Sequence, residues 1–330
     1  LMHKAWGIAI PGLLLIGAAM LRAADPAPIQ EIRNLVFDNY QRLQPRAYNK
    51  DLPVRIADID EKALAKFGQW PWSRVTVAKV VDRLRELGAA VIAFDVWFAE
   101  PDRTAPKAVA ASRPDDPNGQ QAKAEMNALP DPDAILAASI SQVPTALGFA
   151  LLDYDPKRPE KRPAPVGGFS ALGDSPLDFA PQMPHVVAAL PVLQAASAGN
   201  GAVNALPDQD GVIRRVPLII GYKPENADTA PDALLPALGL EAIRIAFQGR
   251  SFTIRSSHAS TETFASAVAN GIGAIRIEGI PEGGPSVVIK TDRGGELLLH
   301  DTGHVPDRFV SIADLFDPDF PRSKVEGQIV

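Results

Sequence analysis

The stretch VRIADIDEKALAKFGQWPWSRVTVAKVVDRLRELGAAVIAFDVWF, residues 54–98, decides the fold of this chain. Its first part, Val54–Asp60, alternates apolar and polar residues in the manner of a strand. Val75–Gly88 carries apolar residues at helical spacing and ends on a glycine, which predicts an amphipathic helix. Ala89–Phe98 is nearly all apolar, as expected of a strand covered on both faces. These segments together predict a strand–helix–strand unit.

Outside this unit, helical and strand-like segments continue to alternate. The predicted helices lie in Asp25–Pro45, Asp131–Gln142, Ala233–Phe247 and Val310–Phe316. The predicted strands lie in Val143–Leu152 and in residues 274–280, 286–292, 296–300 and 325–330. Gly199–Lys223 is predicted to form two strands joined by a hairpin turn at Asp210–Gly211. The alternation predicts an α/β fold, a layered sheet with flanking helices.

The composition excludes several classes of function. The net charge is −6 and the basic residues are scattered, so no basic face exists to neutralise nucleic acid phosphates. The absence of cysteine excludes disulfides, thiolate metal sites and a cysteine nucleophile. The sequence has no G-x-S-x-G elbow, no H-E-x-x-H, no Walker A loop and no G-x-G-x-x-G after a strand. We therefore expect no enzyme activity in this chain, no cofactor and no nucleic acid partner.

The N-terminal segment Ala5–Leu21 has no charged residue. As a helix it falls just short of the hydrocarbon core of a bilayer, which is about 30 Å thick, but it could still span it. Lys4 favours a cytoplasmic N-terminus and an extracytoplasmic body, although Arg22 weakens that argument. We expect an uncleaved transmembrane anchor. A cleaved signal peptide and a buried soluble helix are the alternatives.

Three parts are expected along the chain: an anchor at residues 1–24, a connecting helix and linker at 25–53, and a main domain at 54–330. Residues 99–130 are rich in Ala, Pro, Asp and Lys, which predicts a mobile low-complexity insertion. The chain opens on Leu1 and closes on the strand-like run VEGQIV. We therefore expect it to be a piece of a longer protein.

Three carboxylates are predicted at neighbouring strand ends. Asp58 and Asp60 end the first strand, and Asp95 lies in the second. The carboxyl ends of parallel strands meet where ligands usually bind, and carboxylates there could hold a hard cation. In the alternative, which we favour, Asp58 and Asp60 cap a helix or bond backbone amides, while Asp95 pairs with Arg74. A metal-dependent hydrolase is accordingly the weakest hypothesis, and no metal is expected.

Trp70 and Trp72 flank Pro71 just before Ser73, the expected N-cap of the helix. The two indoles either cover one end of the core or form an aromatic wall beside a ligand crevice. Two other motifs have simpler explanations. Turn chemistry explains PDQDG, residues 207–211, because the further ligands of a calcium loop are missing. The two imidazoles of HDTGH, residues 300–304, lie in a predicted loop and need not share a face.

Val54–Arg103 closely resembles the signature of the type-two CHASE domain, the cyclases/histidine kinases associated sensory extracellular module. That pattern has an aspartate-rich strand, a Gly-x-Trp-Pro-Trp-x-Arg turn, a helix ending in Gly-Ala, and a Phe-Asp strand followed by Glu-Pro-Asp. The corresponding residues here are Asp58 and Asp60, Gly68–Arg74, Gly88–Ala89, Phe94–Asp95 and Glu100–Asp102. Gly201–Leu218 is similar to the second signature of the family. The resemblance covers about residues 35–330, and 99–130 and 256–284 are longer than the usual pattern.

The resemblance implies a sensory input domain on the periplasmic side of the cell inner membrane. Family members typically continue into membrane helices and a cytoplasmic output module. A class III adenylate or guanylate cyclase is expected first, and a histidine or Ser/Thr kinase is the alternative. We expect an unknown small-molecule or envelope ligand and a homodimer formed through the full-length receptor. An envelope protein–protein interaction module is a further alternative, which an exposed apolar patch next to the anchor would favour.

The expected ligand site is the crevice at the strand ends, approached by residues of the second signature. Its candidate residues are Asp58, Asp60, Trp70, Trp72, Arg74, Asp95, Asn204, Asp210, Arg214 and Arg215. Arginine beside carboxylates could bind a zwitterion or a small molecule that carries a carboxylate. In the competing interpretation Arg74 and Asp95 pair with each other and bind no ligand.

Overall fold

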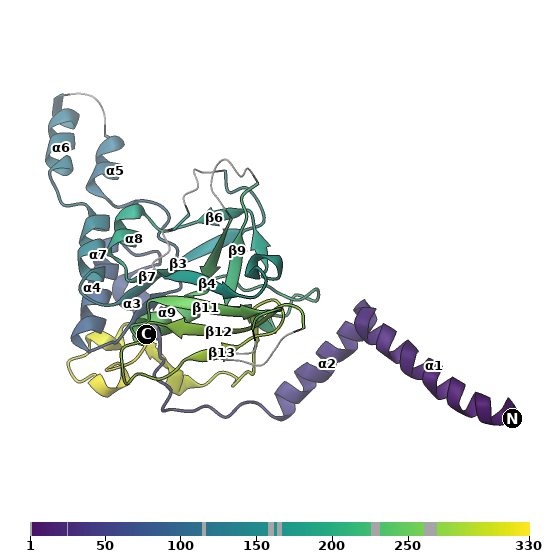
Figure 1. Ribbon diagram of the computed structural model, residues 1–330. Coiled ribbons are helices and arrows are strands. Elements are labelled where there is room, and N and C mark those ends of the chain that lie inside the picture. The colour runs from purple at the N-terminus through teal and green to yellow at the C-terminus, as the bar shows by residue number, and fades with distance from the viewer. Residues whose placement is uncertain are drawn as a thin grey trace. The chain divides into compact units, whose positions relative to one another are not determined.

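The computed structural model describes residues 2–24, 26–113, 117–157, 162–163, 167–225, 232–260 and 269–330, and for 2–9, 22–24 and 117 it describes the backbone alone (Figure 1). The chain forms two compact units. One unit comprises Leu1–Asn49 with His300–Val305, and the other comprises Lys50–Leu299 with Pro306–Val330. All the described strands belong to the second, larger unit.

The smaller unit contains two helices, α1 (Met2–Ala24) and α2 (Ala27–Leu43). A proline stands in the first turn of α2, where its missing N–H costs no hydrogen bond. None of the residues of α2 is buried, and Ile32, Leu35 and Leu43 are 61%, 64% and 79% exposed. The connecting helix predicted in 25–45 is confirmed.

The expected anchor, Ala5–Leu21, is helical and forms part of α1. The side chains of residues 5–9 lie outside the described part of the structure. Within the part that is described, no helix is both long enough and apolar enough to cross a membrane.

Parallel strands form the centre of the larger unit. β3 (Thr145–Leu152) pairs in parallel with β2 (Ile92–Phe94) and with β7 (Gly199–Ala202). β1 (Ile56–Asp58) pairs in parallel with β15 (Phe309–Ser311). Ile329 forms parallel bridges to both Val54 and Val91, so residues 328–330 connect these two groups of strands.

Helices cover both faces of β2 and β3. On one face Ile92 and Leu147 share a core with α4 (Arg74–Glu86), α7 (Pro132–Ile140) and α8 (Pro191–Ala196). On the other face Val91 and Ala146 pack against α9 (Leu238–Ala246). Successive residues of a strand face opposite sides, so burial on both sides explains the nearly continuous apolar run of Ala89–Phe98. The predicted strand–helix–strand unit is confirmed.

The other strands form small sheets, so the fold is mixed α/β with several sheets instead of the single layered sheet that we expected. A four-stranded sheet has the order β13 (Val288–Lys290), β12 (Ile272–Glu278), β11 (Ser251–Ser256), β4 (Gly168–Leu172). A three-stranded sheet has the order β10 (Ala233–Pro236), β9 (Ile219–Tyr222), β5 (Gln182–Met183). β14 (Glu296–Leu298) pairs with β8 (Arg215–Pro217), and β6 (His185–Val187) runs antiparallel to β3.

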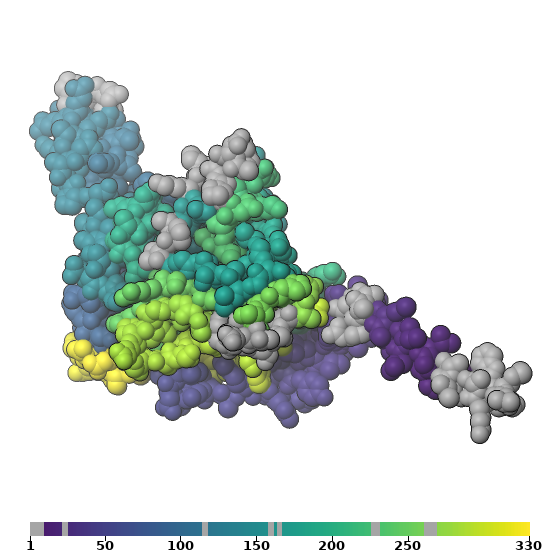
Figure 2. All heavy atoms as spheres, in the orientation of Figure 1, coloured from purple at the N-terminus to yellow at the C-terminus, as the bar shows by residue number. Residues whose placement is uncertain are grey.

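Short helices complete the larger unit. α3 (Glu61–Phe67) follows β1, and single turns of 3₁₀ helix lie at Pro176–Asp178, Pro306–Arg308, Asp314–Phe316 and Arg322–Lys324. The predicted insertion, residues 99–130, contains α5 (Pro106–Ala111) and α6 (Pro117–Asn127), while residues 114–116 lie outside the described part. In Figure 2 these two helices extend away from the rest of the larger unit. The insertion is therefore more regular than its composition predicts.

Three predicted elements are wrong because long-range pairing overrides the local pattern. The runs on either side of Asp210–Gly211 do not pair with each other, since β7 pairs with β3 and β8 pairs with β14. The helix predicted in Ala233–Phe247 begins as strand β10, and only the part from Leu238 is helical. The helix predicted in Val310–Phe316 begins as strand β15 and ends as a 3₁₀ turn.

Candidate functional site

A pocket of about 450 Å³ lies at the carboxyl ends of β2 and β3. Its walls come from the Trp-Pro-Trp turn at residues 70–72, from the loop that follows β2 and from the segment that follows β3. In α/β sheets, ligands usually bind beyond the carboxyl ends of the parallel strands. We therefore take this pocket as the candidate site.

Aromatic side chains form much of the pocket wall. Trp72 is 6% exposed and its indole N–H donates to the carbonyl of Gly68 at 2.7 Å, so this residue belongs to the core. Its ring meets that of Trp70 edge to face, with 5.4 Å between the centroids. Trp97 and Tyr154 are 49% and 62% exposed and also line the pocket. Two exposed rings of this size offer apolar surface to a ligand.

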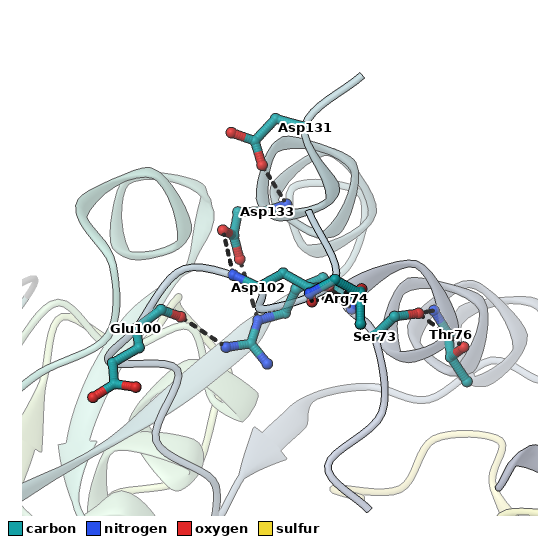
Figure 3. A network of polar contacts seen from close by, with 8 residues as sticks. Ser73, Arg74, Thr76, Glu100, Asp102, Asp131 and Asp133 are labelled. Carbon is teal, nitrogen blue, oxygen red and sulfur yellow. Dashed lines mark hydrogen bonds and ion pairs between the residues drawn. The ribbon is translucent and has the colours of Figure 1, made fainter. Parts of the chain in front are cut away.

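Arg74, the first residue of α4, lines the pocket, and Figure 3 shows the groups that hold its side chain. Its Nε donates to Oδ1 of Asp133 at 3.2 Å, and its Nη2 donates to the carbonyl of Glu100 at 3.0 Å. Its guanidinium also stacks over the ring of Phe98, 4.6 Å from the centroid. The side chains of Arg74 and Asp133 are only 12% and 6% exposed. This ion pair is therefore almost removed from water and holds α4, α7 and the loop after β2 together.

The third guanidinium nitrogen of Arg74, Nη1, makes no hydrogen bond to any residue that the structure describes, and in Figure 3 it points away from the groups that hold the other two nitrogens. Arg74 lines the pocket, and the two N–H groups of this nitrogen are not used by the bonds that hold the side chain.

Asp102 anchors the loop after β2 to the start of α4. Its carboxylate accepts from the backbone N–H of Arg74 at 2.6 Å and from the backbone and hydroxyl of Thr104, both at 2.7 Å. Burial raises the pKa of Asp102, but these hydrogen bonds and the charge of Arg74 outweigh it and leave the pKa below its ordinary value. The backbone N–H of Asp102 in turn donates to Asp133. The loop is thus fixed by the carboxylates of Asp102 and Asp133.

A family model for the CHASE2 domain matches residues 12–330. The chain belongs to the CHASE2 domain family. Comparisons with curated proteins and with solved structures found no match. CHASE2 domains are sensory and typically extracytoplasmic, so membership implies an extracytoplasmic sensor role, and no catalytic domain is found alongside the sensor domain in this chain.

Three of the predicted site residues, Trp70, Trp72 and Arg74, line the pocket of this CHASE2 domain. The predicted ion pair between Arg74 and Asp95 is wrong, because the guanidinium of Arg74 pairs with Asp133 from α7. Asp95 is exposed after β2 and does not line the pocket. That these three residues bind a ligand stays a prediction.

Of the two first-strand aspartates, Asp60 serves the fold. Asp60 caps α3 by accepting from the backbone N–H of Ala63 at 2.9 Å, and it accepts a hydroxyl hydrogen bond from Ser311 at 2.7 Å. Burial raises the pKa of Asp60, while the bonds from Ser311 and Ala63 lower it more, so the net shift is downward. Asp58 is exposed at the end of β1. Within the described residues no group of three possible metal ligands comes together.

The second-signature residues lie outside the pocket. The amide of Asn204 clamps the backbone of Leu151, accepting from its N–H at 2.9 Å and donating to its carbonyl at 2.7 Å. Arg214 is buried and binds both Asp208 and Asp210, at 2.9 and 2.8 Å. This pairing holds the pKa of Asp210 at about 2. Arg215 reaches Asp208 and Asp292, at 3.5 and 3.4 Å.

Sequence reasoning missed most of the pocket wall, including Trp97, Tyr154 and Asp102, and it missed Asp133, the partner of Arg74. A large aromatic residue two or three positions after each of two strands was the available signal for the first two. Asp102 was visible only as part of the family motif, and Asp133 only as an acidic residue in the first turn of a predicted helix.

Proposed function

We propose that this CHASE2 domain is the ligand-binding input of a membrane-bound receptor in the cell inner membrane, and that the pocket beside Arg74 is its ligand site. One observation carries the proposal: exposed Trp97 and Tyr154 line the same pocket as a nearly buried arginine, at the carboxyl ends of parallel strands. We further propose that the receptor is a homodimer with a class III nucleotide cyclase as its output, a histidine or Ser/Thr kinase being the alternative output.

The contacts of Arg74 suggest how ligand binding would change the conformation of other parts of the domain. A ligand changes a conformational equilibrium only through different affinities for the two states. The pocket wall includes the Glu100–Thr104 loop, which is tied to the first residue of α4 and, through Asp133, to α7. A ligand that moves this loop would therefore shift two helices of the core together.

The test of the ligand site is a thermal-shift screen of small molecules against this chain, repeated with Trp97→Ala. We expect compounds that raise the Tm of the wild type and leave the variant unchanged, because ligand binding stabilises only the state that binds it. Loss of Trp97 should not unfold the domain, since the side chain is half exposed. A screen in which every stabilising compound acts equally on both proteins would reject the site.

The test of the receptor role fuses the chain to a cyclase module in cells and measures cyclic nucleotide with and without a compound found in the screen. Separation of the cells into membrane and soluble fractions checks the location. Recovery of the fusion in the soluble fraction would reject membrane attachment. A cyclic nucleotide level that is the same with and without the compound would reject the sensor role.

A second candidate function is an interaction module for an envelope protein. The exposed apolar residues of α2, including Ile32, Leu35 and Leu43, favour it. Polar substitution of these residues would abolish signalling in that case, while Trp97→Ala would leave it unchanged.

A further inference from the structure

We infer that the pocket binds an uncharged, largely apolar ring compound that carries one carbonyl acceptor. The inference rests on the proposed function, because it names the class of ligand for the same pocket.

The walls select a flat apolar ring. Trp97 and Tyr154 line the pocket with about half or more of each side chain exposed, and Val96, Leu152 and Val187 continue the apolar lining. Rings gain contact area against such walls and stack in offset or edge-to-face arrangements. A volume of about 450 Å³ lies within the ordinary range of small-molecule sites and accepts one ring with substituents.

The charges disfavour an ionised ligand. The lining contains two arginines, Arg74 and Arg103, and two carboxylates, Glu100 and Asp102, so the pocket has no excess of either sign. Arg74 also has its own counter-ion, Asp133, at 3.2 Å. An ion that entered would lose its hydration, and Arg103, whose charge is exposed to water, would offset little of that loss.

The hydrogen-bonding groups determine the polar part of the ligand. Nη1 of Arg74 offers donors into the pocket, whereas the hydroxyl of Thr104 already donates to Asp102 at 2.7 Å. A polyol such as a sugar needs many partners for its hydroxyls, and this wall is mostly apolar. One carbonyl oxygen that accepts from Nη1 satisfies the free donor, and the ring covers the rest.

The test compares four probes with the full chain by calorimetry and by the indole N–H signals in ¹⁵N NMR. Benzamide, benzoate and benzamidinium share one shape and carry charges of 0, −1 and +1, and glucose represents the polyols. We expect benzamide to bind most tightly, by about tenfold over each of the other three. As a ligand of few atoms it should bind with a Kd on the order of millimolar.

Variants connect the binding to the pocket. Trp97→Ala and Tyr154→Ala should each weaken benzamide binding about fivefold or more through loss of stacking. Trp97→Phe should retain most of the affinity, and Tyr40→Ala should retain all of it, because Tyr40 is equally exposed but belongs to α2.

The outcomes separate the two proposals. Tighter binding of benzoate, benzamidinium or glucose that still requires Trp97 would overturn the uncharged class and leave the ligand site in place. The ring-binding inference would be overturned if none of the four probes binds, or if the affinity is unchanged in Trp97→Ala and Tyr154→Ala. Either result would also count against the site itself.

Discussion

Arg74 shows how a single side chain can join the fold to the candidate site. Two of its guanidinium nitrogens and its backbone N–H hold Asp133, Glu100 and Asp102, and the remaining nitrogen is left for the pocket. An arginine that made all its bonds within the fold would be a structural residue, and a solvated one would be too mobile to orient a ligand. In the proposed ligand site, this division of its donors would make Arg74 a pre-positioned binding group.

The buried pair of Arg74 and Asp133 leads to a stability prediction. Asp133→Ala should lower the free energy of unfolding by about 3–5 kcal/mol, because it leaves the guanidinium buried without its counter-ion. Glu86→Ala is the matched control, since it removes the carboxylate of the more exposed Arg83–Glu86 pair and should cost less than about 1 kcal/mol. Urea unfolding measures both. Equal costs for the two variants would contradict the burial argument.

For Glu296 we predict the opposite effect, a gain in stability when its charge is removed. Burial, and then the neighbouring Asp292, raise the pKa of Glu296 above its ordinary value. The folded state therefore holds this proton more tightly than the unfolded chain, so ionisation of Glu296 at neutral pH opposes folding. Glu296→Gln should raise the Tm at pH 7 by a few degrees.

The pH dependence checks this assignment. The gain from Glu296→Gln should vanish as the pH falls below the unfolded pKa of about 4.5, because the wild-type carboxyl is then protonated in both states. Calorimetry of both proteins at several pH values makes the comparison. A gain that is equally large in acid would show that the substitution acts through packing and not through charge.

At the scale of elements, Gly148 sets the distance between β2 and β3. A Cβ atom at this position would overlap the carbonyl oxygen of Phe94 and lie 2.9 Å from Cγ1 of Val203. Gly148→Ala should therefore push β2 away and cost about 3 kcal/mol. Gly168→Ala on β4 is the control, since a Cβ there meets nothing within 4 Å and should cost almost nothing. Urea midpoints that shift equally would contradict the close approach.

The elements that the sequence predicts correctly are those with a strong local signal. The amphipathic run that became α4, the apolar run that became β3 and the N-capped α7 each agree with their local pattern. The failures at Asp210–Gly211 and Ala233–Pro236 have one cause. A strand is stabilised by its partner, and the partners of β8 and β10 are β14 and β9, of which β14 lies about 80 residues away in the sequence.

The same limit applies to the candidate site. The tryptophan turn and Arg74 stand out in the sequence, but the residues that fix Arg74 do not. Asp102 and Asp133 lie 28 and 59 positions away from it, and only the packing of α7 beside α4 brings them together. Asp95, which an argument from strand ends alone selects as the partner of Arg74, is exposed to solvent instead. A count of strand-end carboxylates therefore selects the wrong partner.

At the scale of the whole molecule, residues 328–330 hold the central strands together. The backbone N–H of Ile329 donates to the carbonyl of Pro53 at 2.8 Å, and Ala93 donates to the carbonyl of Val330 at 2.8 Å. Ile329→Pro should lower the free energy of unfolding by about 3 kcal/mol, since proline lacks the N–H. Ile329→Val should cost about 1 kcal/mol. Limited proteolysis and urea unfolding distinguish them, and similar costs would show that the bridge contributes little.

The position of residues 328–330 between Val54 and Val91 also has a mechanical consequence. A pull on Val330 along the strand direction would load in shear its own hydrogen bonds to Val91 and Ala93 and those of Ile329 to Pro53 and Arg55, so that they resist together instead of opening one after another. Displacement by even part of a residue would drag β2, whose following loop carries Trp97 and forms one wall of the pocket. In this arrangement tension at one end of the sheet and occupancy of the pocket at β2 act on the same strand.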